Sequence, residues 1–107
     1  MHMFEPNHPI RIILHAPTAS AVARARNNAA NLMKQPAPVE VRIVVNAEAV
    51  GAVLDAPDAA GDALTFVCPN TLSRTGRSAP APLTVLDESA VLAIARMQAD
   101  GWRYIRS

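Results

Sequence analysis

Short apolar runs rich in β-branched residues alternate along this chain with segments of helical periodicity. Residues 10–14 and 39–45 are such runs, and the second becomes continuously apolar toward its end. This pattern is typical of strands buried on both faces of a parallel sheet. In all we expect five strands, at residues 10–14, 39–45, 63–67, 83–86 and 102–105. Because strands alternate with helices, the sequence predicts a three-layer α/β/α domain with a mostly parallel five-stranded sheet.

Residues that favour helix ends separate the predicted elements. Thr18 is a good N-cap for an alanine-rich helix that extends to about Gln35. Asp87 is expected to cap the last helix, and Gly101 to follow its end at about Asp100. Two shorter helices are expected between them, at residues 47–54 and 70–74.

The length of 107 residues fits one domain, which we expect to span residues 1–107 with an N-terminal arm at residues 1–9. Half of the residues are hydrophobic and 18% are charged, which leaves little polar surface for a small domain. We therefore expect a homo-oligomer. The net charge of +1 is spread along the chain, so the sequence indicates no nucleic-acid partner.

A single cysteine cannot form a disulfide within the chain, and no Cys/His pair has the spacing of a zinc site. The turn from His15 to Ser20 contains no glycine, which argues against a dinucleotide or P-loop motif. We predict no metal and no other cofactor. Without a signal-peptide core or an apolar run of about 20 residues, the chain is expected to be cytoplasmic, with no membrane partner.

Polar residues follow three of the predicted strands at the point where each ends. In open α/β sheets, ligands bind at the carboxyl ends of the strands. The residues in these positions are His15, Asn46 and Cys68, with Asn70, Thr71 and Arg74 close behind. We expect these six to share a cleft.

Cys68 is placed at the start of a predicted helix, where unpaired N–H groups and the helix dipole stabilise a thiolate. Within a shared cleft His15 would help to deprotonate it, and Arg74 or Arg77 would stabilise the anion. The alternative is that Cys68 is a small buried hydrophobic residue, that His15 bonds a loop backbone and that the arginines are solvated.

Three stretches, in order, give the chain a family resemblance. They are Asn27-Asn28-Ala29-Ala30-Asn31-Leu32, residues 41–50, and Cys68-Pro69-Asn70-Thr71-Leu72. The first resembles an N-N-x-x-N-L stretch, the second a strand and following helix, and the third a C-x-N-T-[LM] segment of the DsrE/DsrF-like sulfur-relay proteins, which include the YchN-like proteins. The family typically has glycine at the position of Ala47 and often at that of Pro69, so the chain departs from it there.

The resemblance implies a compact α/β subunit that forms dimers, trimers or hexamers, with a cysteine that takes up sulfur as a persulfide and passes it to a partner protein. Carried onto Cys68, this implies an intracellular sulfur carrier with sulfurtransferase-type activity. The alternative is a non-catalytic homo-oligomeric protein that binds a small ligand or serves as a scaffold. A third hypothesis, a sensor that forms sulfenic acid at Cys68, lacks a resolving cysteine in the chain.

Overall fold

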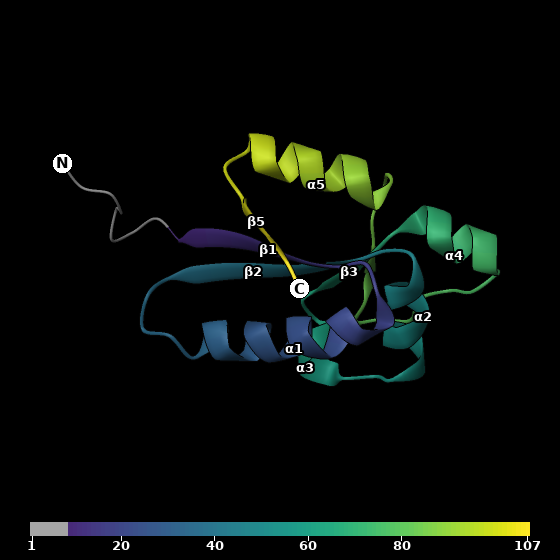
Figure 1. Ribbon diagram of the computed structural model, residues 1–107, viewed down its shortest axis with the longest axis horizontal. Coiled ribbons are helices and arrows are strands. Elements are labelled where there is room, and N and C mark those ends of the chain that lie inside the picture. Colours follow the sequence, from purple (N-terminus) through teal and green to yellow (C-terminus); the bar gives the residue numbers. More distant parts are fainter. Residues whose placement is uncertain (1–8) are drawn as a thin grey trace.

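The computed structural model describes residues 9–107 of the chain (Figure 1). The N-terminal arm expected at residues 1–9 therefore lies outside the described residues, except for Pro9. The elements, in order, are β1 (Ile10–Ala16), α1 (Ala19–Met33), β2 (Val39–Val45), α2 (Glu48–Asp55), α3 (Ala59–Asp62), β3 (Thr65–Val67), α4 (Pro69–Thr75), β4 (Thr84–Val85), α5 (Ala90–Ala99) and β5 (Arg103–Arg106). Within residues 9–107, none of the helices combines the length and the apolar character needed to cross a membrane.

The five strands form one sheet in the order β4-β3-β2-β1-β5, and every neighbouring pair is parallel. β1 and β2 make the longest pairing, from Ile10 opposite Val39 to Ala16 opposite Val45. The α/β class and the parallel five-stranded sheet predicted from the sequence are confirmed.

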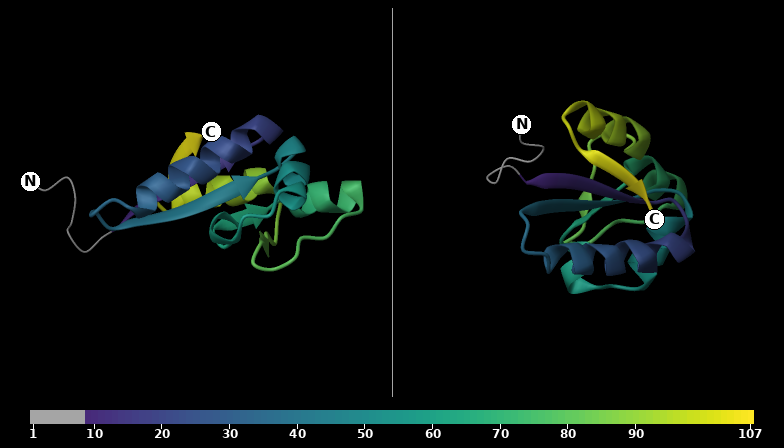
Figure 2. Two further views of the ribbon diagram at one scale, coloured as in Figure 1. Left: turned by 90° about the horizontal axis from the view of Figure 1, so that it is seen from below. Right: turned by 60° about the vertical axis from the view of Figure 1, so that its left-hand side comes forward.

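Alternate strand residues point to opposite faces of the sheet. Both faces carry apolar side chains, and helices cover both. α1 and α2 pack on one face, with α3 beside α1, and α5 lies on the other (Figures 1 and 2). The buried residues of the first face include Leu14, Ile43, Val45, Ala25, Val50 and Val53. Those of the second include Ile13, Val44, Ala93, Ile94, Met97 and Trp102. α4 lies beyond the carboxyl ends of the central strands (Figure 1).

Trp102 lies buried just before β5 and anchors the second face. The guanidinium of Arg42 lies 4.4 Å from the centre of the Trp102 ring and 5.1 Å from that of Phe66, so it is placed between two aromatic rings. A second arginine, Arg11, lies 5.3 Å from the Trp102 ring. Cation–π contacts of this kind let an arginine cover apolar surface while it keeps its charge. Trp102 thus joins α5 to strands β1 and β2.

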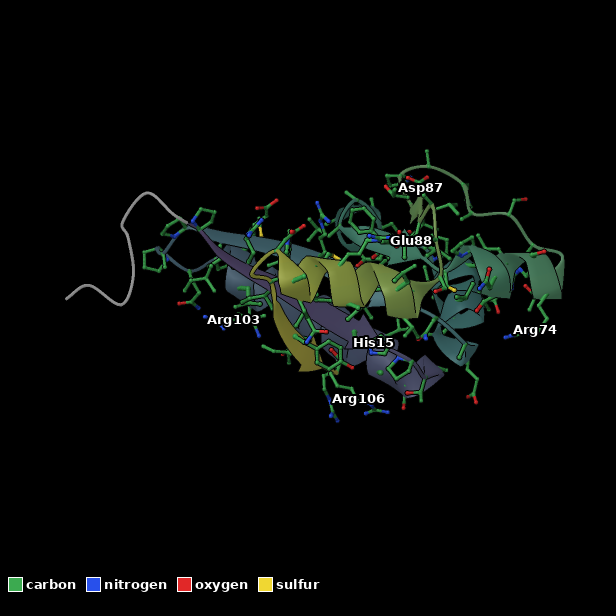
Figure 3. All side chains as sticks on the ribbon, turned by 90° about the horizontal axis from the view of Figure 1, so that it is seen from above. His15, Arg74, Asp87, Glu88, Arg103 and Arg106 are labelled. Atoms are coloured by element: carbon green, nitrogen blue, oxygen red, sulfur yellow. The ribbon has the colours of Figure 1, made fainter. Side chains whose placement is uncertain are left out.

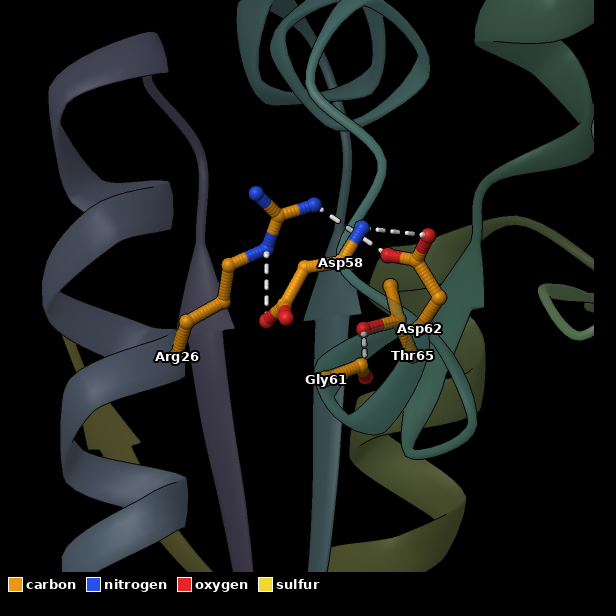
Figure 4. A network of polar contacts seen from close by, with 5 residues as sticks. All are labelled: Arg26, Asp58, Gly61, Asp62 and Thr65. Carbon is orange, nitrogen blue, oxygen red and sulfur yellow. Dashed lines mark hydrogen bonds and ion pairs between the residues drawn. The ribbon is translucent and has the colours of Figure 1, made fainter.

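The one-turn helix α3 occupies the segment expected to be a loop. Arg26 of α1 donates to the buried carboxylate of Asp62 at 3.1 Å, and its Nε lies 3.8 Å from the carboxylate of Asp58 (Figure 4). Asp62 also accepts a hydrogen bond from the backbone N–H of Asp58 at 3.1 Å, and Thr65 donates to the carbonyl of Gly61 at 2.7 Å. These contacts stabilise a turn too short to form by helix propensity alone.

The expected cap of the last helix is wrong. α5 begins after Ser89 rather than Asp87, because the Ser89 hydroxyl accepts a hydrogen bond from the N–H of Leu92 at 3.3 Å. Glu88 instead forms an ion pair with Arg96 at 2.7 Å. With this start, the first turn of α5 lies at the carboxyl ends of the strands, where it borders the candidate site.

Candidate functional site

Cys68 connects β3 to α4 at the carboxyl edge of the sheet. Its N–H donates to the carbonyl of Val45 at 3.1 Å, which fixes it beside the end of β2. It has extended dihedral angles and is the N-cap residue of α4, with Pro69 as the first helical residue. Proline suits that position because its fixed φ matches the helix and its missing N–H would have had no helical partner.

A pocket of about 220 Å³ opens at this edge of the sheet. Its lining residues are Asn46, Ala47, Cys68, Asn70, Thr71, Arg74, Ser89, Ala90 and Val91. Five of the six residues expected to share a cleft are therefore brought together, and His15 is absent from the lining. Arg77 does not line it either, since its side chain forms an ion pair with Asp55 at 2.8 Å.

The Cys68 side chain is only 6% exposed, and it packs on one side against the core beneath α5. Burial raises the pKa of its thiol, whereas hydrogen bonds from the backbone N–H groups of Ala90, Thr71 and Asn70 and from the Thr71 hydroxyl lower it. The net effect places the pKa of Cys68 below its ordinary value. The position thus combines the two alternatives drawn from the sequence: the residue is buried, and its thiolate is stabilised.

The stabilising donors come from the starts of two helices. Asn70 and Thr71 belong to the first turn of α4, and Ala90 is the first residue of α5. N–H groups in a first helical turn have no partner inside the helix, so they are free to face the sulfur. The Thr71 hydroxyl accepts from the N–H of Ala47 at 3.3 Å, which leaves its own proton to be donated. Arg74 adds the one charged side chain among the lining residues.

His15 lies behind Asn46 as seen from the pocket. It is the sixth residue of β1, which continues two residues beyond its expected end. Its Nε2 lies 2.9 Å from the Oδ1 of Asn46, and its Nδ1 lies 2.6 Å from the hydroxyl of Tyr104 on β5. Both ring nitrogens are engaged in this way, and His15 contacts Asn46, which lines the Cys68 pocket, without lining that pocket itself. Figure 3 shows His15 and Arg106 on one side of α5, and Asp87 and Glu88 on the other.

Sequence reasoning missed Ser89, Ala90 and Val91 as pocket residues and Tyr104 as a partner of His15. The first three form the start of α5, which Ser89 caps in place of the predicted Asp87. Tyr104 was missed because its contact depends on β5 pairing with β1, in which Tyr104 lies opposite Ile13. No local pattern in the sequence signals that strand order.

Ala47 is the one residue of the pocket with a strained backbone, with φ 50° and ψ −134°. A β-carbon disfavours this conformation, which glycine adopts freely. We expect Ala47→Gly to raise the free energy of unfolding by about 1 kcal/mol, because the relieved strain exceeds the added entropy of the unfolded chain. Urea denaturation measures this. The matched change Ala52→Gly, inside α2, should lower it by about 1 kcal/mol, and a loss of stability in both variants would contradict the strain at Ala47.

Among residues 9–107, His, Cys, Asp and Glu side chains form no group of three or more that could hold a metal ion. Comparison of the chain with protein-family models gives no match, and comparison with curated proteins gives none either.

Proposed function

We propose that this chain is an intracellular sulfur carrier of the DsrE-like type, with Cys68 as the thiol that forms the persulfide. The observation that carries the proposal is the stabilisation of the Cys68 thiolate, inside a pocket, by donors from two helix starts. A structural buried cysteine has no need of such donors, whereas a nucleophilic cysteine depends on them. The resemblance of residues 68–72 to the C-x-N-T-[LM] segment supports the same assignment.

In the proposed reaction the Cys68 thiolate attacks the outer sulfur of a donor persulfide. A new S–S bond forms at Cys68 while the S–S bond of the donor breaks, and the donor leaves as a thiolate. The proton carried by the transferred sulfur is lost to water, since a persulfide is more acidic than a thiol. A partner's thiolate then attacks that outer sulfur, and Cys68 is released as a thiolate.

The donors around Cys68 serve both steps of this cycle. They stabilise the attacking anion in the first step and the departing Cys68 thiolate in the second. Asn70 and Arg74 are exposed, so the pocket is open to a partner from the side of α4. The proposed partners are a sulfur donor and an acceptor thiol carried by other proteins.

The decisive test is the mass of the native protein after incubation with a small persulfide donor and removal of the excess. We expect the intact mass to increase by one sulfur, and the increase to disappear after treatment with a thiol reductant. Protein unfolded in urea is the control, since it retains the cysteine without the pocket. If native protein takes up no more sulfur than unfolded protein, the proposal fails.

The lowered pKa makes a separate prediction about pH. Because more of the Cys68 thiol is ionised at mildly acidic pH, its alkylation by iodoacetamide should reach half of its maximal rate at a lower pH than that of glutathione. Unfolding the protein should return the midpoint to that of a free cysteine. A native midpoint at or above that of glutathione would contradict the assigned electrostatics.

The alternative is a homo-oligomeric binding or scaffold protein without sulfur transfer, and exposed apolar side chains favour it. Val91 and Leu92 of α5 are 70% and 45% exposed, and Ile105 of β5 is 45% exposed. Such residues would be covered where subunits meet. Sedimentation measurements give the mass of the assembly in solution. An oligomer whose Cys68 takes up no sulfur would support this alternative over the carrier.

A further inference from the structure

We infer that His15 is a positioning residue that turns the Asn46 side chain so that its NH₂ group faces the Cys68 pocket. The inference deepens the proposed function and rests on it, since Cys68 is taken as the reacting group. It starts from three side chains linked by hydrogen bonds: Tyr104 of β5, His15 of the neighbouring β1, and Asn46 at the end of β2. The last of these lines the same pocket as Cys68.

The direction of each hydrogen bond follows from the chemistry of the groups. The Oδ1 of Asn46 can only accept, so the Nε2 of His15, 2.9 Å away, must carry a proton. In the neutral imidazole the Nδ1 is then an acceptor, and the Tyr104 hydroxyl donates to it at 2.6 Å. The order of donation therefore runs from Tyr104 through His15 to Asn46.

This order decides which end of the Asn46 amide is left for the pocket. With the oxygen held by His15, the remaining group is the NH₂, which carries two donor hydrogens. Donors stabilise the anionic sulfur of Cys68 and the negative charge of a bound persulfide. The opposite rotamer would present a carbonyl oxygen, whose lone pairs repel an anion. His15 thus acts on the thiol electrostatically although it does not touch it.

The charged groups near Cys68 and His15 bear on any pH measurement. In the described part of the chain, Arg74 is the charged residue lining the Cys68 pocket, and Glu88, next to Ser89, is paired with Arg96. Asp87 is exposed in the preceding segment. Beside His15, the register partner on β5 is Arg106, and α5 contributes the uncharged Gln98 to a second pocket, of about 370 Å³, that His15 and Tyr104 line.

The first test measures the His15 tautomer of the native protein from the ¹⁵N shifts of the ring nitrogens. We expect the proton on Nε2, with Nδ1 unprotonated. A proton on Nδ1 alone would mean that Asn46 donates to Nε2 and turns its oxygen to the pocket, which would overturn the inference. This result does not depend on whether the protein transfers sulfur, so it separates the inference from the proposed function.

The second test compares variants by the pH profile of Cys68 alkylation. We expect His15→Ala to slow the reaction at mildly acidic pH about fivefold and to move the midpoint to higher pH, since the released Asn46 amide is then free to turn its oxygen toward the anion. His15→Gln, whose amide N–H reaches the same oxygen, should restore most of the rate. Gln98→Ala, in the pocket that His15 and Tyr104 line but without a bond to Asn46, should leave the profile unchanged.

Three results would contradict the positioning role: an unchanged profile in His15→Ala, a profile in His15→Gln no better than in His15→Ala, or an equal loss in Gln98→Ala. Circular dichroism establishes that each variant is folded, and if His15→Ala is not, the tautomer measurement decides. If the tautomer and the variant profiles are as expected but the wild-type protein takes up no sulfur, the carrier function is refuted and the inferred orientation of Asn46 stands.

Discussion

The Cys68→Ser variant is expected to fold like the parent protein and to take up no sulfur from a persulfide donor. A serine hydroxyl is not ionised at neutral pH and cannot form a persulfide, so loading should fall to background. The change removes little volume, and the N–H groups of Asn70, Thr71 and Ala90 remain available to the new hydroxyl. We therefore expect the free energy of unfolding to change by no more than about 1 kcal/mol.

A transplanted thiol provides the control for this variant. Ser73 is exposed on the same helix and does not line the pocket, so Cys68→Ser combined with Ser73→Cys moves the thiol out of the site. We expect the moved thiol to be alkylated with the pH dependence of glutathione. It should also load sulfur more slowly than Cys68 at mildly acidic pH. Sulfur loading of Cys68→Ser above background, or equal loading of the moved thiol, would mean that the pocket contributes nothing.

The largest loss of stability is expected from Trp102→Ala, at about 3 to 5 kcal/mol. The Trp102 ring is buried beneath α5, and its removal leaves a cavity while it also deprives Arg42 and Arg11 of their aromatic partner. The urea midpoint of unfolding measures the effect. A loss of this size is a substantial part of the stability of a domain of this length, so partial unfolding at room temperature is a supporting outcome.

Two variants calibrate the Trp102→Ala result. Trp102→Phe keeps an aromatic face for Arg42 and should cost less than half as much. Ile105→Ala, on the same terminal segment but 45% exposed, should cost about 1 kcal/mol or less. If Trp102→Ala were no more destabilising than Ile105→Ala, Trp102 would not be the anchor of that face of the sheet.

The central strands could be predicted from the sequence because their side chains are mostly apolar and β-branched, as burial on both faces of a sheet requires. Residues 39–45 form β2 with the predicted bounds, since a run rich in β-branched residues that ends continuously apolar favours a strand with helices on both sides. The expected N-cap Thr18 is confirmed, and its hydroxyl accepts from the N–H of Ala21 at 3.2 Å. Gly101 follows the end of α5 with φ 96°, as expected of a residue that ends a helix.

Other features depended on contacts between distant residues. Both Asp87 and Ser89 are good cap residues, and the ion pair of Glu88 with Arg96 belongs to the arrangement in which Ser89 is the cap. β3 is shorter than its apolar run because residues 61–64 form the turn that ends α3 and precedes the strand. In the same way the site residues on β2, β3 and α4 could be anticipated, whereas the contributions of α5 and β5 required the strand order.

The lowered pKa of Cys68 depends in part on the N–H group of Ala90, the first residue of α5. The Ala90 N–H reaches the sulfur only when α5 is docked on the sheet. Detachment of that helix would withdraw this donor and admit water to the sulfur, and would leave only the donors of α4. The alkylation rate of Cys68 therefore reports whether α5 is docked on the sheet, and measuring it requires no attached label.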